Sequence, residues 1–182
     1  AGVLILGALQ GILIAVALSM LMLLHAANRP PAYAVGRKPG TDIFRSLEDF
    51  PDDETFPGLL IMRTEGWLNF ASMPHAREKM RQLVVENNPR VVILECSAIT
   101  DIEYTALLVL LEAEEKLSHT GVQLWLVGLN PNPFRKIRNS PLGQVLGDAR
   151  MYPNLREALN MYLNQTIERN GNYGTKHKKD DL

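Results

Sequence analysis

The sequence predicts an α/β fold, a small mixed β-sheet flanked by α-helices, preceded by one transmembrane helix. Three observations support this prediction. The first 28 residues are almost entirely apolar. Two short apolar runs, VVILE at 91–95 and VQLWLVGL at 122–129, have the composition of strands that are covered on both faces. Segments with helical spacing of apolar residues separate and follow these runs, and such alternation is typical of α/β folds.

The predicted transmembrane segment, residues 1–28, has no acidic or basic residue between Gly2 and Ala27. At about 1.5 Å per residue such a helix extends roughly 39 Å, more than the ~30 Å hydrocarbon core of a bilayer. A secretory signal peptide needs a basic leading region and a shorter apolar core, and the sequence has neither. The sequence begins with Ala, which favours a fragment of a longer protein. Basic residues follow the segment and predict that the remainder is cytoplasmic: Arg29, Arg37 and Lys38.

Four small residues recur at every fourth position of this segment: Gly7, Gly11, Ala15 and Ser19. This spacing lines them along one ridge of a helix, and such ridges let membrane helices approach closely. We therefore expect the segment to pack against other membrane helices, as the last span of a larger bundle. The alternative, a simple anchor for one soluble domain, does not need such a ridge.

Residues 29–58 are rich in Pro, Gly and acidic side chains. They predict a linker with at most one edge strand, near Ile43–Leu47. The run LLIMR at 59–63 predicts a strand, and the following Glu-Gly pair predicts a turn. We therefore expect a β-hairpin between this strand and an extended segment at 67–70.

Residues 74–85 predict a helix, because Pro suits its first turn and apolar residues recur at helical spacing. The buried strand at 91–95 comes next, followed by a polar loop at 96–103 and a second helix at 105–119. Because a helix of crossover length joins 91–95 to the run at 122–129, we expect these two strands to be adjacent and parallel.

A basic helix is predicted around 134–138 and a last helix at 154–166, which complete a domain over residues 59–166. Residues 167–182 have almost no apolar side chains and predict a disordered polar tail. Two interpretations of the basic helix stay open: an ordinary exposed face, or contact with anionic lipid or an acidic partner. Its cationic residues are Arg135, Lys136 and Arg138.

Composition argues against several function classes. The chain has 19 Lys and Arg against 20 Asp and Glu, and every acidic residue lies after position 41, so nucleic acid is not an expected partner. Cys96 is the single cysteine and forms no disulfide within the chain. The histidines lack ligand spacing, so we expect neither a metal nor a cofactor. No catalytic constellation is found, so we do not expect an enzyme. Three carboxylates are interpreted as a solvated helix end: Glu112, Glu114 and Glu115.

Three segments carry a resemblance to a known family: AVGRKPGTDIFR, PGLLIMRTEGWLNFASM and ILECSAITDIEYTALLVLLEAEEKL. In this order they resemble the carboxy-terminal part of SulP anion permeases, from the last transmembrane helix through the cytoplasmic STAS domain. The resemblance covers residues 1–166, and the GRKPGT segment distinguishes it from soluble STAS proteins. It implies a homodimeric secondary transporter of anions such as sulfate, bicarbonate or dicarboxylates, with the anion bound in membrane helices outside this sequence.

The loop from Glu95 to Thr105 is similar to the signature of STAS anti-sigma factor antagonists, in which a serine at a helix start is phosphorylated. Tyr104 occupies that position here, so we expect the kinase switch to be lost. Asp101 and Glu103 are expected to satisfy the positive helix end, which disfavours a nucleotide phosphate there. The loop is then a docking or regulatory surface, with these residues: Ser97, Thr100, Asp101, Glu103, Tyr104 and Thr105.

Two functional hypotheses follow from the sequence. In the first, the chain is part of a SulP-type anion transporter whose STAS domain serves dimerisation, assembly or regulation without catalysis. Its partners are then membrane lipid, the remaining transmembrane domain and a second copy of the chain. In the second, it is a membrane-tethered STAS adaptor of the anti-sigma factor antagonist type, which acts by binding a kinase or another regulator.

Overall fold

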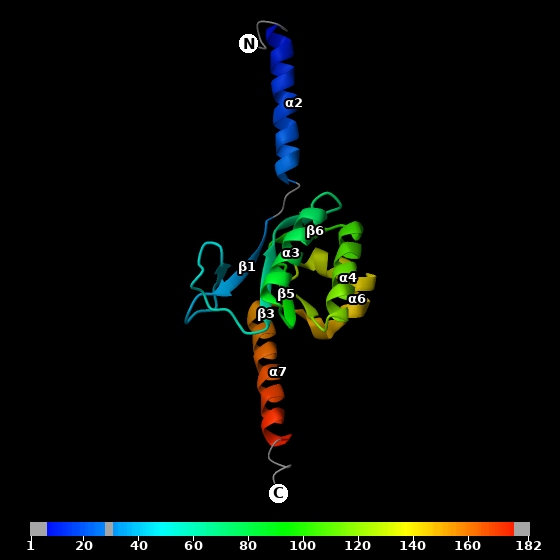
Figure 1. The fold of residues 1–182 in the computed structure, drawn as a ribbon. Coiled ribbons are helices and arrows are strands. Elements are labelled where there is room, and N and C mark those ends of the chain that lie inside the picture. Colours follow the sequence, from blue (N-terminus) through cyan, green and yellow to red (C-terminus); the bar gives the residue numbers. More distant parts are fainter. Residues whose placement is uncertain (1–6, 28–30, 177–182) are drawn as a thin grey trace.

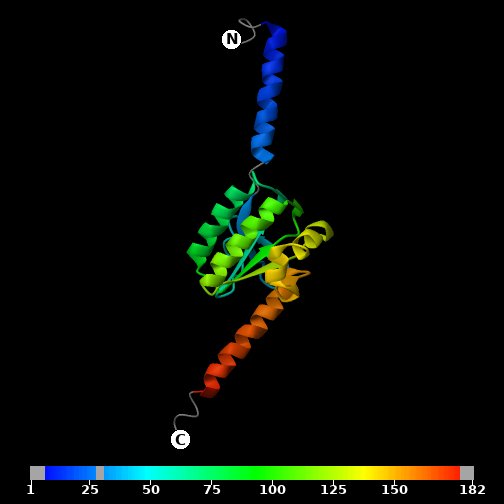
Figure 2. The same cartoon turned by 90° about the vertical axis from the view of Figure 1, so that its right-hand side faces the viewer.

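The computed structural model describes residues 7–27 and 31–176. Helix α2 (Ala8–Ala27) precedes a mixed α/β body, and helix α7 (Leu155–Lys176) projects from the body (Figures 1 and 2). The body therefore holds the strands and helices that position any functional site.

A six-stranded sheet forms the centre of the body, in the order β2-β1-β3-β5-β7-β8. Neighbouring strands from β3 to β8 are parallel, whereas β1 is antiparallel to both β2 and β3. The predicted adjacency of the two apolar runs is confirmed, because β5 pairs in parallel with β7. The strands are β1 (Ala32–Arg37), β2 (Phe44–Ser46), β3 (Leu59–Thr64), β5 (Val91–Glu95), β7 (Gln123–Val127) and β8 (Met151–Tyr152).

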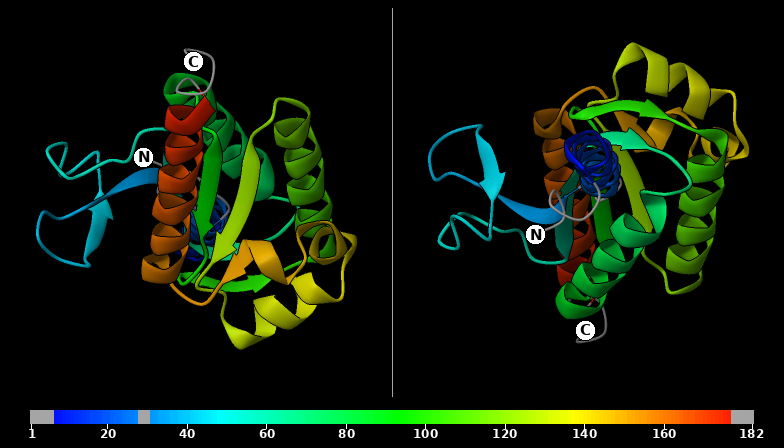
Figure 3. Two further views of the ribbon diagram at one scale, coloured as in Figure 1. Left: turned by 90° about the horizontal axis from the view of Figure 1, so that it is seen from below. Right: turned by 90° about the horizontal axis from the view of Figure 1, so that it is seen from above.

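Helices cover both faces of this sheet (Figure 3). Successive side chains of a strand point to opposite faces. In β5, Val92 and Leu94 therefore enter one core, while Val91 and Ile93 enter the other. One core is closed by four helices, α3 (Met73–Asn87), α4 (Tyr104–His119), α5 (Pro131–Arg138) and α6 (Pro141–Leu146), and the other by α7.

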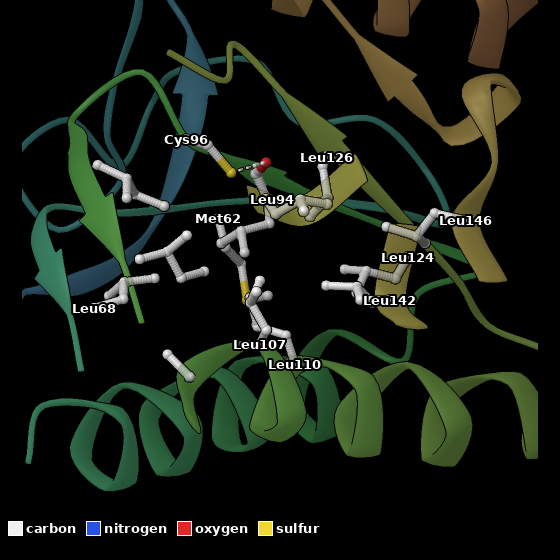
Figure 4. Packing of buried hydrophobic residues seen from close by; sticks show 14 of the residues in the cluster. Met62, Leu68, Leu94, Cys96, Leu107, Leu110, Leu124, Leu126, Leu142 and Leu146 are labelled. Carbon is white, nitrogen blue, oxygen red and sulfur yellow. Dashed lines mark hydrogen bonds between the residues drawn. The ribbon is translucent and has the colours of Figure 1, made fainter. Parts of the chain in front are cut away.

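The larger core lies between the sheet and helices α3, α4 and α6 (Figure 4). Met62 and Leu94 from the sheet meet Leu107 and Leu110 from α4 and Leu142 from α6, and none of them is more than 4% exposed. Burying each such side chain contributes roughly 1.5–3 kcal/mol. The core therefore fixes α4 on this face of the sheet.

Helix α7 is held on the opposite face by aromatic packing. The Tyr162 ring lies edge-on to Trp125 of β7 at 6.5 Å between ring centroids, and its hydroxyl donates to the Pro57 carbonyl at 2.7 Å. The helix continues to Lys176, so the prediction of a disordered tail from residue 167 is wrong up to that point. Once the packed first half has nucleated the helix, further turns form at little cost. Residues 177–182 lie outside the described residues.

Two short strands outside the main sheet, β4 (Gly66–Leu68) and β6 (Ile99–Ile102), pair in parallel with each other. The predicted hairpin between 59–63 and 67–70 is therefore wrong. Gly66 adopts a φ of 81°, which turns the chain away from β3, and its N–H donates to the Ala98 carbonyl at 2.9 Å. The segment predicted as a polar loop at 96–103 contains β6, a strand too short to give a periodic signal.

Residues 32–37 form β1, an interior strand of the main sheet, where the sequence predicted only a linker with at most one edge strand. The six residues AYAVGR are too few to show a clear period, and their pairing with β3, from Ala32↔Thr64 to Ala34↔Met62, is a long-range contact. The predicted edge strand at Ile43–Leu47 overlaps β2, which lies at the edge of the sheet.

Helix α2 carries Gly11, Ala15 and Ser19 at every fourth position, but Gly7 precedes the helix with a φ of 80°. The predicted four-residue ridge therefore has three members on the helix. No helix has the length and apolarity of a membrane span within residues 7–27 and 31–176. The span predicted over 1–28 is thus not confirmed, and residues 1–6 and 28–30 lie outside the described residues.

Candidate functional site

The candidate site is the segment from Glu95 to Thr105, at the edge of the sheet where β3, β5 and β7 end. Strand β5 delivers Glu95, which is buried, while Ser97 and Thr100 are exposed on either side of the start of β6. Helix α4 begins at Tyr104, and Glu103 alone separates it from the end of β6. The fold therefore brings all six predicted residues to one edge.

Backbone and carboxylate contacts fix the first half of this segment. The Glu95 carboxylate accepts from Arg63 Nε at 2.6 Å and from the Ser97 N–H at 2.9 Å. The Asn130 side-chain amide, just before α5, donates to the carbonyls of Ser97 and Ile99 at 3.0 and 2.9 Å. Ser97 is therefore presented to solvent by a rigid frame.

Asp101 is bound by α5 and does not cap α4. Its carboxylate accepts from Lys136 Nζ at 2.6 Å and from the Asn132 side-chain amide at 3.0 Å. The hydrogen bond from the Lys136 ammonium holds the pKa of the Asp101 carboxyl below its usual value. The expectation that this carboxylate occupies the helix end is wrong, because Asp101 precedes the helix by three residues and faces a cation on α5.

The start of α4 is held by backbone contacts. The Glu103 N–H donates to the Leu68 carbonyl of β4 at 2.8 Å, and the Glu103 side chain makes no capping hydrogen bond. The Tyr104 side chain is 61% exposed, and Thr105 is exposed as well. The segment thus offers hydroxyl groups on a fixed surface, an arrangement suited to contact with a partner.

Glu114 of α4 is buried, so its interpretation as part of a solvated helix end is wrong. It is 3% exposed and its Oε1 lies 2.7 Å from Arg150 Nη1, in the short 3-10 helix at Asp148–Arg150. Burial of a carboxylate costs free energy, and a paired cation such as Arg150 offsets that cost. The helical spacing of Glu114 with the buried Leu107 and Leu110 was the signal that could have placed it on the inner face.

The described residues hold no cluster of three or more His, Cys, Asp or Glu side chains that could bind a metal ion. Cys96 is 1% exposed, and burial raises the pKa of its thiol well above the usual range. Since the thiolate is the reactive form, this cysteine is a poor nucleophile.

A cavity of about 530 Å³ lies beside the segment, between the ends of β3 and β5 and the start of α7. Sequence reasoning missed this cavity because its walls come from segments far apart in the chain. Four of its five charged side chains form pairs, Arg63 with Glu95 at 2.6 Å and Asp42 with Arg156 at 2.6 Å. The fifth, Glu157, accepts from the Asn154 side-chain amide at 2.9 Å. Because most of these charges are already paired, the lining indicates no particular class of ligand.

Residues 50–158 match the sequence family described as the STAS domain. The chain is 29% identical over 162 residues to high affinity sulfate transporter 2 of Stylosanthes hamata, an alignment that covers 84% of this chain and 24% of that protein. The murine solute carrier 26 family member A9 anion transporter superposes with a TM-score of 0.68 at 19% identity, covering 84% of this chain and 25% of that one. An anti-sigma factor antagonist from Mycobacterium paratuberculosis has a TM-score of 0.50 at 24% identity, covering 59% and 88%.

The chain therefore belongs to the STAS-domain family. Its sequence relatives are sulfate transporters, in agreement with the resemblance to SulP permeases carried by the three segments. The chain spans about a quarter of the length of the curated relatives it matches. The superpositions show the fold alone, and that fold is shared by transporters and anti-sigma factor antagonists.

Proposed function

We propose that the chain is the membrane-proximal and cytoplasmic part of a SulP-type secondary anion transporter of the sulfate, bicarbonate or dicarboxylate class. In this proposal the STAS body serves dimerisation, assembly or regulation and performs no chemistry. The anion binds in membrane helices outside the chain. The six residues from Ser97 to Thr105 form the docking or regulatory surface.

The observation that carries this proposal is the extent of the alignment. The match to high affinity sulfate transporter 2 covers 84% of the chain, more than the STAS match at 50–158 alone. Similarity therefore continues outside the domain that adaptors and transporters share. The adaptor hypothesis predicts no such extension, so the alignment favours the transporter.

Helix α2 is the proposed last membrane helix. It contains 20 residues without an acidic or basic side chain. Apolar side chains are exposed around the described part of it, including Leu9, Ile12, Leu13, Val16, Leu18 and Leu21. Such a surface is stable in lipid or against other apolar helices, and costs free energy in water.

The transporter proposal is tested by expressing the gene that encodes this chain in cells that lack sulfate uptake. We expect the cells to take up labelled sulfate. Alternatively, they take up bicarbonate or a dicarboxylate, and that anion competes with sulfate. Membrane localisation without transport of any of these anions, together with stable binding of a kinase, would favour the adaptor.

The proposed dimer and helix packing are tested in membranes. Single cysteines introduced into the STAS surface at Ser97 and Thr100 are expected to crosslink between protomers in a Cys96→Ser background. Gly11→Leu is expected to disturb assembly, because a large side chain prevents close approach of helices, whereas Leu13→Ile is the matched control. Absence of crosslinks in an active transporter contradicts the dimer, and normal assembly of Gly11→Leu contradicts the packing.

A further inference from the structure

Four aromatic side chains are exposed within residues 7–23 and 31–167, and three of them lie on β4, in the turn after it and at the start of α4. Trp67 is 52% exposed, Phe70 73% and Tyr104 61%, and Leu108 on α4 is exposed beside them at 43%. The fourth, Phe50, is covered by the Arg45 guanidinium at 3.8 Å from the ring centroid. We call Trp67, Phe70, Tyr104 and Leu108 the aromatic patch.

Backbone hydrogen bonds hold the aromatic patch together. Trp67 points outward from β4 while the next residue, Leu68, is 1% exposed. The Glu103 N–H donates to the Leu68 carbonyl. Trp67 precedes Leu68 and Tyr104 follows Glu103, so the two aromatic residues flank the same hydrogen bond. Leu108 follows Tyr104 by one helical turn and so shares its face.

Phe70 is equally fixed in place. It lies in a turn where the Asn69 side-chain oxygen accepts from the N–H groups of Ala71 and Ser72, at 2.9 and 3.1 Å. The ring is therefore presented by an ordered turn. Contiguous apolar patches on a rigid surface mark sites that another surface covers.

Strand β6 lies at the end of the body that α2 enters (Figure 1), and β4, which carries Trp67, pairs with it. The first residue of β1, Ala32, pairs with Thr64, and β4 begins two residues later. Five residue steps separate Ala27, the end of α2, from Ala32, so the two are at most about 18 Å apart. A bilayer that holds α2 is therefore within reach of the patch.

Resting on the proposed function, in which α2 is a membrane helix, we propose that the aromatic patch inserts into the headgroup region of the bilayer and holds the STAS body against the membrane. Trp and Tyr favour this region, because it accommodates an apolar ring together with a polar N–H or O–H group. Asp101, the β6 partner of Trp67, is neutralised by its ion pair with Lys136, so it does not oppose contact of the patch with lipid.

The size of the patch favours lipid over a second copy of the chain. A fully buried aromatic side chain covers about 150–250 Å². Four partly exposed side chains therefore fall short of the roughly 800 Å² that each partner buries in a stable protein interface. A bilayer needs no such minimum area, because α2 already tethers the body.

Trp67 reports directly on this contact. The chain has two tryptophans, and the other, Trp125, is 1% exposed in the core. The full chain is reconstituted in phosphatidylcholine vesicles, with or without bromine atoms on the acyl carbons next to the headgroup. Brominated lipid is expected to quench the tryptophan emission, and Trp67→Phe is expected to abolish this quenching. Phe70→Ser should weaken the quenching, whereas Val85→Ser, an exposed apolar residue on α3, should not.

Each outcome separates the inference from the proposed function. Recovery of the chain with vesicles but equal emission in both lipids refutes the inference and leaves the membrane helix intact. A blue shift of Trp67 without quenching means that protein covers the patch, which also refutes the inference. A chain that does not float with vesicles refutes the membrane helix of the proposed function, and this inference with it.

Discussion

Removal of the Glu114 carboxylate tests how strongly one buried ion pair stabilises the body. The pair joins α4 to the 3-10 helix before β8, with 2.7 Å between Glu114 Oε1 and Arg150 Nη1. The Glu114 side chain is 4% exposed and that of Arg150 23%. Arg150 also donates to the carbonyls of Leu146 and Val145, so it retains partners when Glu114 is truncated.

These contacts set the expected magnitude. Removing one partner of a fully buried ion pair costs about 3–5 kcal/mol. Because Arg150 keeps two carbonyl acceptors and some contact with water, we expect Glu114→Ala to lower the free energy of unfolding by about 2–3 kcal/mol. For a domain of this size that corresponds to a fall in Tm of roughly 10 °C.

Glu112 provides the matched control on the same helix. It pairs with Arg77 and Lys116, but all three side chains are about half exposed or more. Glu112→Ala should therefore cost less than ~1 kcal/mol. Urea unfolding of the full chain in detergent, followed by the emission of buried Trp125, measures both variants. Equal midpoints for Glu114→Ala and Glu112→Ala would refute the assignment of Glu114 to the stabilising core.

Three further predictions concern the body. Ile93→Asp should unfold it, because Ile93 is 0% exposed and an unpaired carboxylate there costs several kcal/mol; Val85→Asp at an exposed position of α3 should leave the Tm nearly unchanged. Gly143→Ala should lower the free energy of unfolding by about 1–3 kcal/mol, since a Cβ would overlap the α5 backbone. Gly121→Asn, in open space with a φ of 78°, should lower it less. Cys96 should react slowly with maleimide in the folded chain and rapidly in urea.

Each of these predictions has a contradicting result. A folded Ile93→Asp chain with wild-type Tm contradicts the placement of β5 at the centre of the sheet. Equal stability of the two glycine variants contradicts the close approach of α6 to α5. Labelling of Cys96 at the same rate with and without urea contradicts its burial.

Local patterns of sufficient length were enough to predict much of the fold. VVILE and VQLWLVGL are continuous apolar runs, and a strand covered on both faces requires such a run. The intervening 16-residue helix α4 has enough turns to show its period, and its length forces a parallel crossover between β5 and β7. The SulP resemblance likewise rested on contiguous segments; the family match confirmed its STAS part, and the sulfate transporter relatives agree with the rest.

The candidate site was predicted as a segment, but its chemistry depends on contacts over long sequence separations. Asp101 and Lys136 are 35 residues apart, and Glu114 and Arg150 are 36 apart. The sequence places a carboxylate near a helix start or within a helix, and either position is compatible with solvent. Only the packing of α5 and the 3-10 helix determines which carboxylate meets a cation.

The sequence by itself determined the family, the parallel pairing of the two central strands and the apolar character of α2. The tertiary structure decided the rest: β1 and β6 are strands because β3 and β4 offer them free backbone groups, although their own residues are too few to show a period. It also decided that Trp67, Phe70 and Tyr104 are exposed in the aromatic patch. Periodicity is a property of a segment, whereas strand pairing, burial of charge and surface patches depend on which segments meet in space.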